Sequence, residues 1–168
     1  GNILEPLGPT GHDSHAAVGK QVTFTAQGQS QTFLNTLLSA DAASTRIEMI
    51  AHVKDGQVVR GYLRSTAGAG TTWQSDKSGE TATTSALLAK AGPGTEVTFT
   101  VVPAGSGTRL ALDRDGDGYY DYDEYLNCTN PADPTSFGVG VCAGGEGEGE
   151  GEGEGSTGGE GEGEGEGS

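Results

Sequence analysis

The sequence predicts a small α+β fold: an antiparallel sheet with about two short helices laid on it. Paired β-rich runs around turn residues indicate the sheet, and two short runs at helical spacing indicate the helices. We expect an irregular lead-in at 1–19, an α+β module at 20–142 and a disordered Gly/Glu-rich spacer at 143–168. Roughly 120 residues are then left for a core, which suffices for one modest domain. The start at Gly1, without a methionine, suggests a processed product or an excised piece of a longer protein.

The first half of the module reads as strand, helix and hairpin. Residues 20–27 alternate apolar and polar side chains, which predicts a strand. Residues 30–42 carry apolar side chains at helical spacing, with Ser30 as the expected N-cap. Residues 46–65 hold two β-rich runs that flank an Asp-Gly pair at positions 55 and 56. That pair favours a tight hairpin turn.

The second half adds a short strand at 71–76 and a short helix at 81–92, which Gly92 and Pro93 would end. Residues 95–102 and 108–113 both alternate apolar and polar side chains around a Gly-rich turn, and we expect a second hairpin from them.

An acidic loop, residues 113–124, would leave the last of these strands. It concentrates six acidic side chains, while nine of the 24 acidic residues lie in the terminal Gly/Glu repeat, so the rest of the chain is nearly neutral. The chain therefore has no basic face for nucleic acid or an anionic membrane, and no apolar run approaches the ~20 residues of a membrane span.

The spacing within the acidic loop matches a twelve-residue calcium loop. Carboxylates occupy positions 1, 3, 5, 9 and 12, a glycine occupies position 6 at the sharp turn, and position 7 would offer its backbone carbonyl. The expected ligands are Asp113, Asp115, Asp117, Tyr119, Asp121 (through water) and Glu124. Asp123 lies off this pattern and is expected to face solvent at the start of a helix, where its charge suits the helix dipole.

The predicted ion is Ca²⁺, because Mg²⁺ dehydrates reluctantly and rarely takes so many protein ligands. The alternative is an acidic surface loop whose spacing is accidental. Because residues 108–113 alternate like a strand, we expect a helix only on the exit side of the loop. The sequence holds one such loop, so we expect a structural staple rather than a calcium switch.

Residues 113–136, "DRDGDGYYDYDEYLNCTNPADPTS", resemble the calcium-binding repeats of bacterial secreted proteins related to thrombospondin type 3 repeats. Dockerin modules, which carry two such loops, are similar in the loop and the single exiting helix. The preceding residues look like a C-terminal segment of secreted bacterial multidomain proteins, some with cytochrome-like or β-propeller regions upstream. The resemblance implies calcium as the ion and a place in a larger secreted protein.

Cys128 and Cys142 are the only cysteines. Their even count and acidic surroundings favour a disulfide that closes a short loop and contributes about 3 kcal/mol. Two unrelated thiols are the alternative, and a zinc site lacks the usual set of nearby ligands.

No residue set in the sequence supports catalysis. His12 and His15 lie in the Gly/Pro-flanked lead-in, where no rigid element would hold them. We expect a non-catalytic, extracellular calcium-binding module, secreted or at the cell surface, whose partners are the neighbouring domains of the same protein. Two alternatives remain: a calcium-dependent docking module for an extracellular protein, and an accessory fragment of a redox or hydrolytic enzyme whose catalytic domain lies upstream.

Overall fold

The computed structural model describes residues 15–65 and 72–140. The expected spacer and Cys142 lie outside the described residues, as does most of the lead-in. The described elements follow the order β1 (Gln21–Phe24), α1 (Thr32–Ala42), β2 (Ile47–Asp55), β3 (Val58–Arg64), β4 (Thr72–Ser75), β5 (Thr81–Thr83), α2 (Thr84–Leu88), β6 (Thr95–Pro103), α3 (Gly107–Ala111) and α4 (Asp121–Asn127).

The six described strands form one antiparallel sheet in the order β1-β6-β2-β3-β4-β5. The predicted α+β class is confirmed at this level. The hairpin expected around the Asp-Gly pair is β2–β3, where Asp55 pairs with Val58 and leaves Gly56 and Gln57 in the turn. Gly56 takes the positive φ (60°) that such a turn needs.

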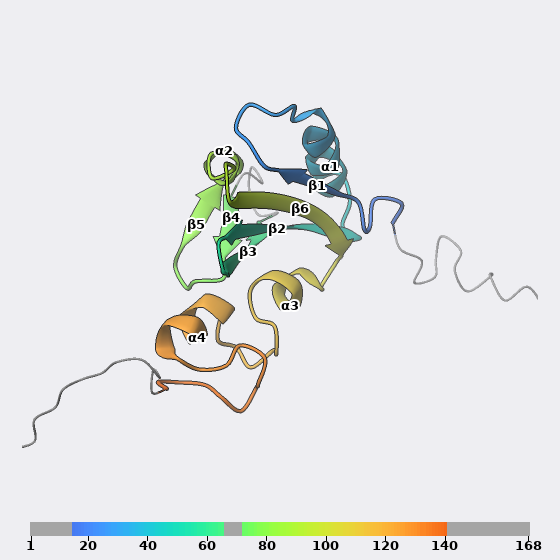
Figure 1. The fold of residues 1–168 in the computed structure, drawn as a ribbon. Coiled ribbons are helices and arrows are strands. Elements are labelled where there is room, and N and C mark those ends of the chain that lie inside the picture. The colour runs from blue at the N-terminus through green and yellow to red at the C-terminus, as the bar shows by residue number, and fades with distance from the viewer. Residues whose placement is uncertain (1–14, 66–71, 141–168) are drawn as a thin grey trace, which may run out of the picture.

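Helices lie on both faces of the sheet, α1 and α2 on one and α3 on the other, with α4 beyond α3 near the turn between β4 and β5 (Figure 1). Alternate residues of β2 point to opposite sides. One set packs with Leu34, Leu37 and Leu87 from α1 and α2 in the main core. Ile50, on the other face, packs with Ala111 and Leu112 in a smaller cluster. The second cluster packs the residues just before the acidic loop against the sheet.

The strand expected at 108–113 is wrong, because the chain forms helix α3 there. Strand β6 instead pairs with β1 and β2 in the interior of the sheet, so it needs no hairpin partner from this segment. Alternation over so few residues does not separate a strand from a short helix, and Thr-Arg-Leu-Ala-Leu contains good helix formers.

Three smaller differences concern the ends of elements. Ser30 does not cap α1, because the N-cap is Gln31, whose side chain makes no capping hydrogen bond. The expected helix at 81–92 divides into β5 and α2, with Thr83 capping α2 through a bond from the Ala86 N–H. Ala17, within the expected lead-in, is buried in the main core.

Candidate metal centre

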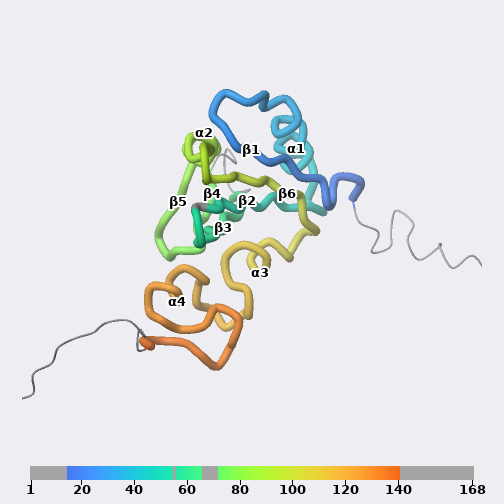
Figure 2. Tube along the Cα trace, viewed as in Figure 1, coloured from blue at the N-terminus to red at the C-terminus, as the bar shows by residue number. Residues whose placement is uncertain are grey.

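The acidic loop lies between α3 and α4 on the face of the sheet opposite α1 (Figure 2). The Asp121 N–H donates to the Leu112 carbonyl (2.8 Å) and joins the two ends of the loop beside the smaller apolar cluster. The expected helix on the exit side is α4, but the expectation that no helix precedes the loop is wrong, because α3 occupies that position.

Asp113 organises the first half of the loop from a buried position. Its two carboxylate oxygens accept the N–H groups of Gly116 (2.7 Å) and Gly118 (3.0 Å). Gly118, at the predicted sharp turn, has φ of 97°, a conformation that disfavours any residue with a Cβ. The glycine at position 6 thus has the backbone role that the sequence assigned to it.

The side chains of Asp113, Asp115 and Asp117 converge. One oxygen from each lies within 4.8 Å of the others. One oxygen of Asp115 accepts the Asp117 N–H (3.3 Å), and one of Asp117 accepts the Tyr119 N–H (2.8 Å). The remaining oxygens of Asp115 and Asp117 are buried, and no hydrogen-bond donor from the described residues reaches them.

Glu124, on the first turn of α4, is 1% exposed. Thr129 Oγ1 donates to its Oε1 (3.2 Å), whereas Oε2 has no hydrogen-bond partner among the described residues. Burial, together with the nearby charges of Asp115, Asp117 and Asp121, raises the pKa of Glu124 from 4.5 to about 7, against the opposing effect of Thr129. A carboxylate in such a place is stabilised by a cation.

Asp121 is held by Arg114 at the edge of this group. Its oxygens accept the Arg114 backbone N–H (2.8 Å) and a guanidinium N–H (3.2 Å). That Asp121 reaches the ion through water therefore stays a prediction. The predicted ligation by the backbone carbonyl of Tyr119 also stays a prediction. The exposed ring of Tyr119 stacks on Phe137, with 5.9 Å between ring centroids.

Asp123 does not point freely to solvent, contrary to expectation. Its Oδ2 accepts both the N–H (2.8 Å) and the hydroxyl of Ser78, in the β4–β5 turn (residues 76–80). The neighbouring Tyr122 N–H donates to the Asp76 carbonyl (3.0 Å), and the Tyr122 ring covers the Arg60 guanidinium. Sequence reasoning missed these contacts because they join segments more than 40 positions apart, and no local pattern signals them.

Cys128 is disulfide-bonded, and Cys142, the other cysteine of the sequence, lies outside the described residues. Cys128 ends α4 in a left-handed conformation (φ 58°). The following chain returns to the same place, where the Gly140 N–H donates to the Asn127 carbonyl (2.7 Å). A Cβ at Gly140 would lie 2.3 Å from the Cys128 carbonyl oxygen, so the return depends on glycine.

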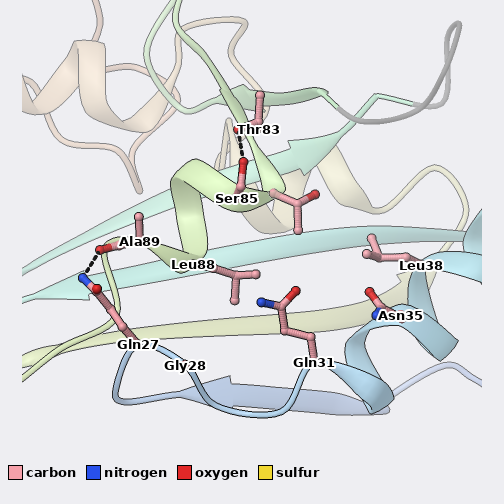
Figure 3. Close-up of a pocket in the computed structure, with 10 residues that line it drawn as sticks. Gln27, Gly28, Gln31, Asn35, Leu38, Thr83, Ser85, Leu88 and Ala89 are labelled. Carbon is pink, nitrogen blue, oxygen red and sulfur yellow. Dashed lines mark hydrogen bonds between the residues drawn. The ribbon is translucent and has the colours of Figure 1, made fainter.

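A separate groove, with a volume of about 640 Å³, lies between α1 and α2 on the other face of the sheet (Figure 3). Amides and hydroxyls line it, among them Gln31, Asn35 and Ser85, together with the apolar Leu38 and Leu88. No charged side chain is among the described lining residues. The groove therefore lacks the ligand chemistry that distinguishes the acidic loop.

Of the described helices, none has both the length and the apolar character to cross a membrane. No family model, no curated protein and no solved structure matches this chain. Function must therefore be inferred from the local chemistry of the acidic loop.

Proposed function

We propose that the protein is a non-catalytic calcium-binding module in which one Ca²⁺ fastens the acidic loop and α4 to the sheet. Asp113, Asp115, Asp117 and Glu124 would supply carboxylate oxygens, with the Tyr119 carbonyl and, through water, Asp121 completing the shell. The ion would supply positive charge that offsets the repulsion among these carboxylates.

The observation that carries the proposal is that three of the four buried side-chain oxygens without hydrogen-bond partners in the described chain lie in the acidic loop: Asp115 Oδ2, Asp117 Oδ2 and Glu124 Oε2. Buried carboxylate oxygens normally find donors, because an unsatisfied one is costly. These three belong to positions 3, 5 and 12 of the loop. A hard cation bound by these carboxylates would satisfy such oxygens.

Calcium suits these ligands better than magnesium. Ca²⁺ accepts six to eight oxygens at variable angles, whereas Mg²⁺ demands a tight octahedron and retains water. The loop offers three converging carboxylates, a buried Glu124 and positive-φ glycines at positions 4 and 6, which would make a protein-rich cage.

The proposal also places the module outside the cell, as part of a larger secreted or surface protein. A disulfide-bonded cysteine favours an oxidising compartment. Millimolar calcium in such a compartment would keep a loop of ordinary affinity loaded, as a structural staple requires.

The experiment is a calorimetric calcium titration of the full chain, compared with Glu124→Gln and with Glu96→Gln. Glu96 is exposed on β6, so its variant makes the same chemical change away from the loop. We expect one ion per chain for wild type and Glu96→Gln, and loss of that binding in Glu124→Gln. Both variants keep the terminal Gly/Glu repeat, so weak binding there cancels. Equal binding by wild type and Glu124→Gln would contradict the proposal.

A second candidate, a calcium-dependent docking module, is favoured by the surface around the loop. Large apolar side chains are exposed along residues 119–139, where a monomer would usually bury or disperse them. They are Tyr119, Tyr125, Leu126, Phe137 and Val139. The partner would be an extracellular protein with a complementary apolar surface.

The test of docking is capture from a cell-surface extract by the calcium-loaded chain, with a chelator-treated chain and a Tyr119→Ser, Phe137→Ser double variant for comparison. A partner lost in both, while the double variant still binds calcium, would support docking. The same capture by all three proteins would exclude it.

A further inference from the structure

We infer that the β4–β5 turn (residues 76–80) positions Glu124 for the metal, and that Asp123 and Ser78 are the positioning residues. This inference rests on the proposed function, because it concerns how the calcium ligand at position 12 is held. It assigns a role in metal binding to residues outside the ligand pattern of the loop.

Adjacency within α4 links the turn to Glu124. Three consecutive residues at the start of the helix have distinct surroundings: Tyr122 and Asp123 bond the β4–β5 turn, and Glu124 is buried with its Oε2 unpartnered among the described residues. Since a helix is rigid over one turn, fixing residues 122 and 123 also fixes the place and direction of the Glu124 side chain.

The attachment of α4 to the turn combines several kinds of contact. Asp123 Oδ2 receives two donors from Ser78, one of them a backbone N–H (2.8 Å). The Tyr122 N–H bonds the Asp76 carbonyl (3.0 Å). The Tyr122 ring lies 3.6 Å from the guanidinium carbon of Arg60. One contact uses a charged acceptor, one uses the backbone, and one places a cation on an aromatic face. Together they restrain both the position of α4 and its rotation about its axis.

The turn itself is fixed to the sheet. Asp76 is buried, and its carboxylate accepts from Arg60 Nε (2.7 Å) and from the Gly61 N–H (2.8 Å) of β3. The Asp76 N–H in turn donates to the Gly61 carbonyl (2.9 Å). The surface that holds α4 is therefore part of the sheet framework.

The short elements around the loop make such support necessary. Helix α3 has five residues and α4 has seven, too short to be stable alone. The sequence has one loop of this spacing, so no second loop steadies it. Partners that orient metal ligands typically change metal affinity by roughly 10–100-fold when removed.

The test measures calcium dissociation constants by calorimetry for Asp123→Ala, Ser78→Ala and the double variant, with Asp133→Ala as matched control. Asp133 also accepts an N–H and a hydroxyl, both from Thr135, but it lies outside the loop. We expect Asp123→Ala to bind about tenfold more weakly or worse, Ser78→Ala to bind several-fold more weakly, and the double variant to match Asp123→Ala. Asp133→Ala should bind as wild type does.

Asp123→Asn separates positioning from charge, because it keeps an acceptor oxygen for Ser78 while removing the negative charge. Recovery of affinity in Asp123→Asn relative to Asp123→Ala supports positioning. If Asp123→Asn binds as weakly as Asp123→Ala while Ser78→Ala binds normally, Asp123 acts through charge alone and the inference is overturned.

Should Asp123→Ala fail to fold, as circular dichroism would show, Ser78→Ala tests the same attachment by removing the hydroxyl donor, and unchanged calcium affinity in it would overturn the inference. Failure of the proposed function looks different, since wild type itself would then show no binding.

Discussion

Glu124 combines two properties that an ordinary surface glutamate lacks. It is buried at the base of the loop, and the charges of Asp115, Asp117 and Asp121 surround it. In the metal-free protein its pKa is raised from 4.5 to about 7, so near neutral pH the carboxyl is partly protonated. Binding calcium requires the charged form, which makes the proton and the metal competitors.

Calcium affinity should therefore fall on mild acidification. A ligand with a pKa of about 7 gives a dissociation constant about tenfold weaker at pH 6 than at pH 8, whereas a pKa of 4.5 would give almost no change over that range. Titrations at both pH values, in buffers of different ionisation enthalpy, would also detect about half a proton released per ion at pH 7. A dissociation constant that stays the same from pH 6 to pH 8 would contradict this assignment.

The stability of the metal-free protein should change with pH in the direction opposite to calcium affinity. Because the folded pKa of Glu124 lies above its unfolded value, the folded state binds more protons between about pH 4.5 and pH 7. The contribution of Glu124 to the free energy of unfolding therefore falls as pH rises through that window.

Single residues in the acidic loop were predictable because their roles are local. The alternating aspartates and the glycine at 118 are close in sequence, and the structure brings three of the aspartates together. The expectation that Asp123 faces solvent was wrong, because its partner Ser78 lies 45 positions away and nothing near Asp123 in the sequence indicates that contact.

At the scale of elements, α3 packs on the sheet more closely than a side chain would allow. A Cβ built on Gly61 of β3 would lie 1.8 Å from the Ala111 carbonyl oxygen. Gly107 is similarly close to Leu63 and Glu48, and its N–H donates to Glu48 (2.8 Å). Two glycines thus set the distance between α3 and strands β2 and β3.

Gly61→Ala should destabilise the protein by about 1–3 kcal/mol, because backbone atoms must move apart to admit the methyl group. Urea unfolding at saturating calcium measures this free energy. Gly92→Ala is the matched control, since a Cβ there meets nothing within 4 Å and its φ is not positive. Equal stabilities for the two variants would show that α3 moves away from the sheet at little cost.

Long elements with a strong pattern were predictable, and short ones were not. Helix α1 and the β2–β3 hairpin formed where apolar periodicity and the Asp-Gly pair indicated. Residues 108–113 alternate as a strand would, yet they fold as α3, because contact with Ile50 and Leu63 decides so short a segment. Tertiary packing, absent from the local pattern, resolves such cases.

The proposed ion would fasten the acidic loop and α4 to a sheet on which they rest through a small apolar cluster. The smaller apolar cluster contains four buried residues, so α3, the loop and α4 have little core of their own. If free calcium exceeds the dissociation constant about a hundredfold, binding adds about 2.7 kcal/mol to the free energy of unfolding.

Removing calcium should therefore lower the melting temperature by roughly 10 °C, at about 4 °C per kcal/mol for a domain of this size. Scanning calorimetry with calcium and with EDTA measures the difference. The Glu124→Gln variant should have the same melting temperature in calcium as in EDTA. A wild-type melting temperature indifferent to EDTA would rule out the staple.

The α+β class could be predicted from the apolar and polar pattern of the sequence, but the placement of helices on both faces of the sheet could not. The sequence predicted helices laid on an antiparallel sheet, and the structure has helices on both of its faces. The second layer depends on Gly61, Gly107 and the β4–β5 turn, whose contacts are long-range.

The return of the chain at Gly140 has a mechanical consequence. The two ends of the described chain leave the molecule on different sides, the first near β1 and the second beyond α4 (Figure 1). Tension applied at residue 140 would reach α4 along the covalent chain of residues 128–140 and would pass to the sheet through Asp123 and the acidic loop. The loop thus lies in series with any load that the C-terminal segment carries, and an ion bound there would act as a tensile link.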